Sequence, residues 1–144
     1  MQIHHLSPDY AVSPQISPED VAAIVQAGFA GVICNRPDTE VPHALRADAL
    51  RHAVEAAGLR FEELPLTHQT MTSDNIAKQV ELAKACNGPV LAYCASGTRC
   101  SVVWAISQVG HMSVDHILQK ARSAGYNLEG LRPTLSSMAL SAEI

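Results

Sequence analysis

The sequence has few positive charges, and it contains no hydrophobic run of the length that spans a membrane. Ten Lys and Arg residues against 14 Asp and Glu residues give a formal net charge of -4. This balance argues against a nucleic-acid partner and against membrane binding through basic residues. The first residues also lack the basic start and apolar stretch of a secretory signal, and carry Asp9, Glu19 and Asp20 instead. We therefore expect a cytoplasmic protein with no nucleic acid and no membrane among its partners.

The sequence also lacks a regular arrangement of cysteine and histidine. Its four cysteines, at positions 34, 86, 94 and 100, include no C-x-x-C pair, and its seven histidines are scattered. Disulfide frameworks and zinc sites usually show closer pairing. His111 and His116 lie five residues apart, which is the wrong spacing for one face of a helix. We expect no disulfide framework, no metal site and no cofactor.

What the sequence does contain is a steady alternation of short apolar runs and helical stretches. A length of 144 residues with 47% hydrophobic content suits one domain with its own core, over residues 1–144. Strands that alternate with helices predict an α/β fold, a three-layer sandwich in which a central, mostly parallel sheet is flanked by helices. We expect strands at 3–6, 10–13, 31–35, 60–66 and 89–93, and helices at 17–28, 43–57, 72–88, 102–109, 113–124 and 128–140, the last interrupted by Pro133.

Two turns that follow apolar strands carry unusual side chains. One consists of Asn35, Arg36, Pro37 and Asp38, and the other of residues 94–99, which read C-A-S-G-T-R. Because parallel strands end at the same edge of a sheet, we expect both turns at that edge, where α/β proteins bind ligands.

The turn of residues 94–99 has the composition of an anion-binding loop with a sulfur nucleophile. Its small residues allow successive backbone N–H groups to point inward, and a following helix adds its unpaired amides and dipole. Such surroundings lower the pKa of a thiol, so we expect Cys94 to be a thiolate at neutral pH. Arg99 supplies a planar fork for two oxygens. We expect the anion to contact the loop residues and a nearby hydroxyl, namely Ala95, Ser96, Gly97, Thr98 and Ser101.

The strand and turn of residues 89–99, with Trp104 beyond them, resemble the phosphatase-like domain of bacterial beta-lactamase hydrolase-like proteins, a family similar to the dual-specificity phosphatases. Residues 10–20, the turn at 35–38 and the segments 124–126 and 131–133 resemble other parts of that family. The resemblance implies a hydrolase of phosphate monoesters in which Cys94 forms a phosphocysteine and Arg99 stabilises the transferred oxygens. The substrate would be a small phosphorylated compound or a phosphoprotein, and the oligomeric state stays open.

The resemblance leaves the general acid unassigned. Dual-specificity phosphatases usually place an Asp on a loop before the nucleophile, but residues 64–69 contain no carboxylate. We take Asp38 as the candidate acid and His68 as its substitute, and we place Asn35, Arg36 and His68 in the substrate pocket.

A second interpretation of the same loop is that it serves in sulfur transfer. Tyrosine-type phosphatases use C-x5-R, whereas this loop is one residue shorter and has the length found in rhodanese-type sulfurtransferases. Such an enzyme would form a persulfide on Cys94 and would need no acid. A third interpretation is that the chain is a non-catalytic, anion-binding domain. Cys100 stands where the family more often shows Ser, and is either a resolving thiol for Cys94 or a small core residue.

Overall fold

The computed structural model describes residues 1–142. It contains one five-stranded sheet in the order β1-β2-β5-β3-β4. β1 is antiparallel to β2, and the remaining pairs are parallel. The mostly parallel central sheet predicted from the sequence is therefore confirmed. The strands are β1 (His4–Ser7), β2 (Tyr10–Ser13), β3 (Gly31–Cys34), β4 (Arg60–Glu63) and β5 (Val90–Tyr93).

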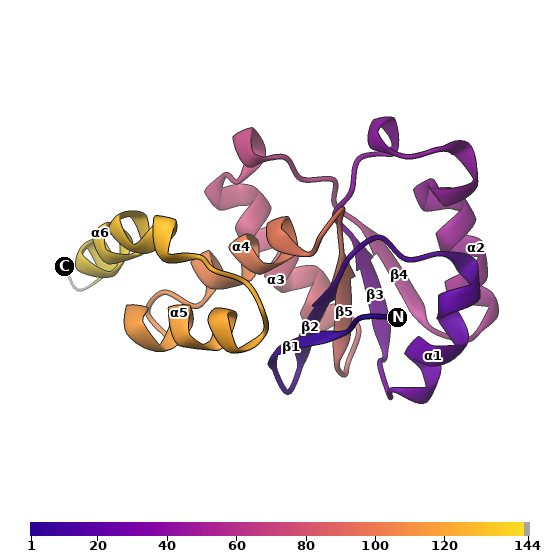
Figure 1. Cartoon of the computed structure of the whole chain (residues 1–144), viewed down its shortest axis with the longest axis horizontal. Helices are drawn as coiled ribbons and strands as arrows, with labels where there is room; N and C mark the ends of the chain where they lie inside the picture. The colour runs from indigo at the N-terminus through magenta and orange to yellow at the C-terminus, as the bar shows by residue number, and fades with distance from the viewer. Residues whose placement is uncertain (143–144) are drawn as a thin grey trace.

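Helices cover both faces of this sheet, which completes the three layers (Figure 1). One side carries α1 (Val21–Gln26) and α2 (Ala47–Ala56), and the other carries α3 (Ser73–Ala85), α4 (Thr98–Ser107) and α5 (Val114–Ser123). Helix α6 (Arg132–Ala142) packs against α5 at the far end of the molecule. Five short 3₁₀ turns lie between these elements: η1 (Pro18–Asp20), η2 (Asp38–Glu40), η3 (His43–Leu45), η4 (His68–Thr70) and η5 (Glu129–Leu131).

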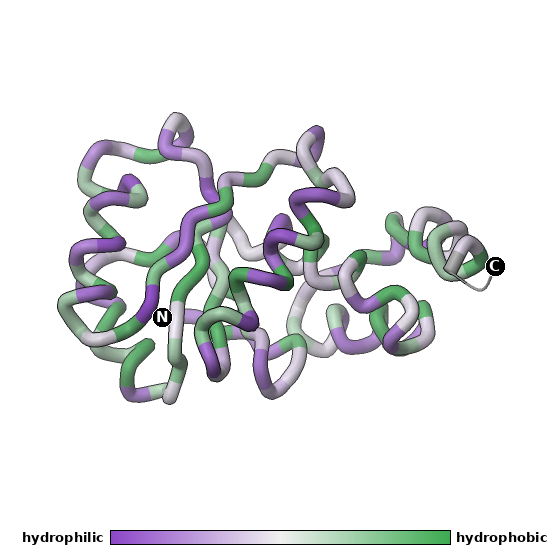
Figure 2. Tube along the Cα trace, turned by 180° about the vertical axis from the view of Figure 1, so that it is seen from behind, coloured by the Kyte–Doolittle hydropathy of each residue, from purple (hydrophilic) through white to green (hydrophobic). Residues whose placement is uncertain are grey.

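The core consists of two large hydrophobic clusters, one on each face of the sheet, and a small third cluster of Leu64, Leu66 and Val103. Every residue of β5 is buried, as expected for a central parallel strand that is covered on both faces. In Figure 2 the hydrophobic residues run along the strands in the middle of the molecule, and hydrophilic residues alternate with them along the outer helices. Helix α4 is almost entirely buried over Cys100 to Ala105, as its apolar sequence predicted. Among residues 1–142, no helix is long and apolar enough to cross a membrane.

Several element boundaries differ from the sequence prediction. β1 is shifted by one residue, β4 ends at Glu63 and not at residue 66, and 3₁₀ turns at 18–20 and 129–131 precede α1 and α6. Helix α4 begins at Thr98, not near residue 102, so Arg99 and Cys100 lie in its first turn. Residues 43–45 form a separate 3₁₀ turn, because Arg46 has an extended backbone that starts α2 one residue later. Pro133 does not interrupt the last helix. It lies in the first turn of α6, where a missing N–H costs nothing.

The chain connections diverge at one edge of the sheet. β3 and β5 are adjacent and parallel, but β3 leads into α2 on one face and β5 leads into α4 on the other. Chain segments that leave neighbouring strands toward opposite faces separate from each other, and ligands of α/β proteins bind at such points. The segment after β3 and the turn of residues 94–99 meet here, where the carboxylate of Glu40 pairs with Arg99.

Candidate active site

The cysteine loop, residues 94–99, joins the end of β5 to the first turn of α4. Gly97 is the N-cap of α4 and has a φ of 94°, a left-handed conformation that side chains other than glycine rarely adopt. A Cβ atom at this position would also collide with the hydroxyl of Tyr126. Glycine is therefore required at this position both for the backbone turn and for the neighbouring tyrosine.

Two hydrogen bonds hold the outer side of the loop. The hydroxyl of Tyr126 donates to the carbonyl of Ser96 at 2.9 Å, and the amide of Gln15 donates to the carbonyl of Ala95 at 3.2 Å. With these carbonyls turned outward, the following amides face the opposite way. The amide of Gly97 accordingly donates to the sulfur of Cys94 at 3.1 Å.

The sulfur of Cys94 is surrounded by hydrogen-bond donors. The neighbouring thiol of Cys100 has the largest lowering effect on the pKa of Cys94, and the amides of Cys100, Gly97 and Arg99 add to this effect. These donors outweigh the burial of the side chain and lower the pKa of Cys94 to about 5. Cys94 is therefore a thiolate at neutral pH, as the sequence predicted. The other three cysteines are buried, and burial raises their pKa.

Arg99 is held by a carboxylate that the sequence analysis did not single out. Its Nη1 and Nη2 atoms donate to the two oxygens of Glu40 at 2.9 and 2.7 Å, and Nη1 also donates to the carbonyl of Leu66 at 2.9 Å. A guanidinium has five N–H donors. Among the described residues, these three bonds are the ones that Arg99 makes, so its Nε–H and one Nη2–H stay available on one edge of the fork.

Glu40 belongs to η2 and comes two residues after Asp38. Its carboxylate also accepts from Nε of Arg36 at 3.4 Å. The hydrogen bonds from Arg99 come first among the causes that lower the pKa of Glu40, so this side chain is a carboxylate at neutral pH. The acidic residue in the turn after β3 was visible in the sequence, but its pairing with Arg99 depends on the path of that turn.

Asn35 and Arg36 have structural roles in this arrangement. Asn35 is fully buried and donates from Nδ2 to the carbonyl of Leu64 at 2.8 Å and to Gln79 at 2.9 Å. Arg36 contacts Gln15 at 3.2 Å in addition to Glu40. Neither residue lines the hollow above the cysteine loop in the part of the chain that the structure describes.

Two other expected contacts of site residues are corrected by the structure. The carboxylate of Asp38 accepts from the amide of Ala47 at 2.8 Å, which stabilises the start of α2, and Asp38 is absent from the described lining of the hollow. The hydroxyl of Ser101 donates to the carbonyl of Gly97 at 2.7 Å, because the helix begins early and its preceding turn supplies the nearest acceptor, and Ser101 is absent from the described lining of the hollow.

A hollow of about 460 Å³ lies above the cysteine loop. Its walls bring His68, the predicted substitute acid, to the same place as the loop and Glu40. The lining consists of Glu40, Thr67, His68, Gln69, Ala95, Ser96, Thr98 and Arg99. The hydroxyls of Ser96 and Thr98 are 2.9 Å apart at its floor.

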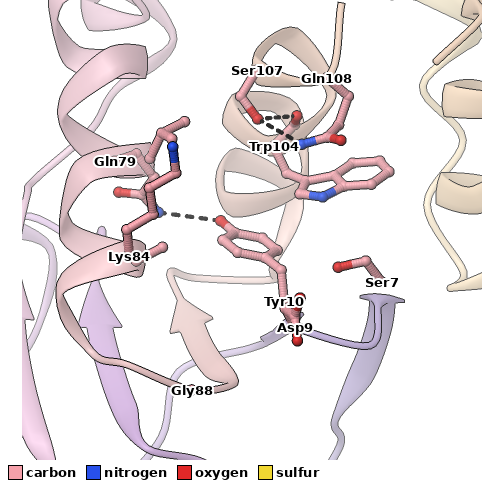
Figure 3. A pocket seen from close by; sticks show the side chains of 11 residues that line it. Ser7, Asp9, Tyr10, Gln79, Lys84, Gly88, Trp104, Ser107 and Gln108 are labelled. Carbon is pink, nitrogen blue, oxygen red and sulfur yellow. Dashed lines mark hydrogen bonds between the residues drawn. The ribbon is translucent and has the colours of Figure 1, made fainter. Parts of the chain in front are cut away.

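A second hollow, of about 540 Å³, lies toward the amino ends of β2 and β5, with Asp9 and Gly88 in its wall (Figure 3). Tyr10 connects its interior to the cysteine loop. The Tyr10 hydroxyl accepts from Gln79 at 3.2 Å and donates to the carbonyl of Cys100 at 2.9 Å. Within residues 1–142, none of the residues 94–99 lines this hollow, whereas Ala95, Ser96, Thr98 and Arg99 line the first one, so the first hollow is the candidate active site.

Comparison with known proteins gives concordant results. The family model described as "Beta-lactamase hydrolase-like protein, phosphatase-like domain" matches residues 2–111. A beta-lactamase hydrolase-like protein of Xylella fastidiosa is 28% identical over 130 residues, which cover 89% of this chain and 30% of that protein. The chain thus spans about a third of the length of this curated relative.

Solved structures share the fold. A candidate phosphatase of Neisseria meningitidis is 34% identical, with a TM-score of 0.86, and the match covers 95% of this chain and 98% of the other. TpbA of P. aeruginosa, solved as a cysteine-to-serine variant with phosphotyrosine, is 16% identical with a TM-score of 0.64, over 94% of this chain and 90% of that one. The second likeness concerns the fold alone.

Proposed function

Because the chain belongs to the phosphatase-like domain family of beta-lactamase hydrolase-like proteins, we propose that it hydrolyses phosphate monoesters with Cys94 as the nucleophile. The observation that carries this proposal is the thiolate of Cys94 at the amino end of α4, beneath loop amides and beside the guanidinium of Arg99. The solved complex of TpbA with phosphotyrosine supports a phosphorylated substrate.

The reaction would proceed in two displacements. The sulfur of Cys94 attacks phosphorus, a phosphocysteine forms, and the leaving alcohol oxygen takes a proton. Water then attacks phosphorus, which releases phosphate and restores the thiolate. The amides of residues 95–99 and the free edge of Arg99 would hold the equatorial oxygens, where charge is greatest in the transition state.

In this scheme Glu40 is a positioning residue. It binds the end of the Arg99 fork, while the Nε–Nη2 edge remains for the substrate. Since Arg99 lowers the pKa of Glu40, this carboxylate is not the proton donor. His68 lines the hollow and Asp38 is engaged by α2, so we propose His68 as the general acid.

Sulfur transfer is a second candidate, and a specific observation favours it. The loop has the six-residue length of rhodanese-type enzymes, and both nearby carboxylates are engaged, Asp38 by Ala47 and Glu40 by Arg99. Formation of a persulfide on Cys94 needs no general acid, so a site whose nearby carboxylates are both engaged also suits sulfur transfer.

A paired assay separates the two functions. We expect the wild-type protein to release phosphate from an aryl phosphate, and Cys94→Ser to lose this activity by at least about 10³-fold because the serine hydroxyl is not ionised. Cys86→Ser is the matched control, since Cys86 lies at the end of α3, and it should retain the activity. The other arm follows sulfur transfer from thiosulfate to cyanide. Sulfur transfer without phosphate release would overturn the phosphatase proposal.

The positioning role of Glu40 predicts that its substitution lowers kcat/KM. Glu40→Gln keeps the shape of the side chain but removes its charge, so Arg99 loses its anchor and kcat/KM should fall by about tenfold or more. Glu62→Gln, which removes the partly buried ion-pair partner of Arg60 on β4, is the control and should have no effect. A higher kcat/KM for Glu40→Gln would mean that Glu40 competes with the substrate for Arg99.

The assignment of the acid is tested by the leaving group. For an alkyl phosphate, whose leaving oxygen needs a proton, His68→Ala should lower kcat by about 10²–10⁴-fold, with a much smaller effect on an aryl phosphate. Asp38→Asn should instead lower the free energy of unfolding by about 1 kcal/mol through the weakened start of α2. If the leaving-group dependence appears in Asp38→Asn, Asp38 is the acid and the assignment to His68 is wrong.

A further inference from the structure

The second hollow, between α3 and α4 near the amino ends of β2 and β5, is walled by buried side chains (Figure 3). Trp104 is 4% exposed, Tyr10 is 8% exposed and Gln79 is 2% exposed. Its volume of about 540 Å³ lies within the range of small-molecule sites, which are commonly lined by aromatic side chains with a few polar groups. The second hollow therefore has the size and the walls of a ligand site.

The indole N–H of Trp104 is a buried donor that has no acceptor within residues 1–142. The backbone carbonyl of Trp104 accepts from Ser107, but no hydrogen bond is made by its indole nitrogen. This nitrogen is not sealed in by protein, since in the described chain the fully enclosed side-chain atom without a partner is the hydroxyl of Tyr93. In Figure 3 the nitrogen edge of the indole faces the space between Tyr10 and Ser7. Buried tryptophan N–H groups usually have a partner, and here a ligand atom would supply it.

The polar groups around this N–H indicate the chemistry of the ligand. Lys84 comes from α3 on the opposite wall, and Ser7 comes from the end of β1. In the part of the chain that the structure describes, the ammonium of Lys84 belongs to no ion pair. Three donors thus surround one space: an indole N–H, a hydroxyl and an ammonium. A negatively charged group with acceptor oxygens, such as a carboxylate, complements them.

Asp9 limits the charge that such a ligand can carry. Its side chain lies exposed at the rim of the second hollow, where it would repel a multiply charged anion, and Lys84 can balance one negative charge. The rest of the ligand would meet apolar surface. That part of the lining consists of Tyr10, Val80, Ala83 and Trp104.

We propose that the second hollow binds a small organic monocarboxylate, which accepts from the indole N–H of Trp104 and lays its apolar body against Trp104 and Tyr10. Within residues 1–142, the cysteine loop contributes nothing to the lining of this hollow. The inference is therefore independent of the reaction that Cys94 catalyses, and the two proposals can fail separately.

Benzoate is a suitable probe, and Trp104 reports on its binding. The chain contains one tryptophan, so isotope-labelled protein gives a single indole N–H signal in a proton–nitrogen correlation spectrum. We expect a saturable downfield shift of that proton as benzoate is added, because a carboxylate accepts a strong hydrogen bond. Benzyl alcohol keeps the ring without the charge and should bind at least about tenfold more weakly. An indole signal that does not move, or that responds equally to the alcohol, would overturn the proposal.

Two lysines of α3 provide a matched comparison. Lys84→Gln removes the balancing charge and should weaken benzoate binding by about two- to fivefold, because Lys84 is exposed. Lys78→Gln is the control, since Lys78 lies on the same helix, is also exposed and is absent from the lining of the second hollow. It should bind benzoate as the wild type does. Equal weakening in both variants would contradict the proposal.

Two further variants locate the bound probe. Trp104→Phe keeps an aromatic wall but lacks the N–H, so the affinity for benzoate, measured by calorimetry, should fall by about tenfold. Cys94→Ser should keep the wild-type affinity, because the proposed site lies away from the cysteine loop. Loss of the indole shift in Cys94→Ser would place benzoate at that loop and overturn the proposal. If Trp104→Phe does not fold, the comparison of the two lysine variants still decides the question.

Discussion

The candidate active site depends on one interaction, the stabilisation of a buried negative charge on the sulfur of Cys94. Removing an anion from water is unfavourable unless donors replace the lost hydration. Here the replacements are the thiol of Cys100 and the amides at the amino end of α4. Those donors converge because Gly97 adopts a positive φ and because Tyr126 and Gln15 hold the outer carbonyls of the loop. Substitution of any of these residues would act through the charge on the sulfur.

Arg99 contributes to the site through the fixed orientation of its guanidinium group. The carboxylate of Glu40 and the carbonyl of Leu66 fix the guanidinium from segments that follow β3 and β4, so three neighbouring strand ends are joined at one edge of the sheet. A guanidinium that is already oriented loses little conformational freedom when it binds an anion. Phosphoryl transfer and sulfur transfer both need a thiolate beside such a group, and the proton donor distinguishes them.

The sequence predicted the features that are encoded locally. Cys94, Gly97 and Arg99 fall within one strand-to-helix turn, where residue types alone indicate a nest for an anion beside a thiolate. The mostly parallel sheet follows from the alternation of strands and helices along the chain. Features that depend on the path of the turn after β3 could not be predicted. Glu40 was missed, because only the folded turn brings it to Arg99. Asp38 and Ser101 were expected in the substrate site. Instead, Asp38 accepts a hydrogen bond from the amide of Ala47 at the start of α2, and Ser101 donates one to the carbonyl of Gly97 at the start of α4.

The acidity of Cys94 is the quantity that tests this account most directly. The rate of iodoacetamide alkylation, followed at Cys94 by peptide mass, should rise with pH and reach half its maximum near the pKa of about 5. Replacement of the Cys100 thiol by Ala should move this midpoint upward, because the largest stabilising donor is lost. Cys34 and Cys86 should stay unmodified at pH values where Cys94 reacts, since burial raises their pKa. A midpoint near that of an ordinary thiol, about 8.5, would contradict the account.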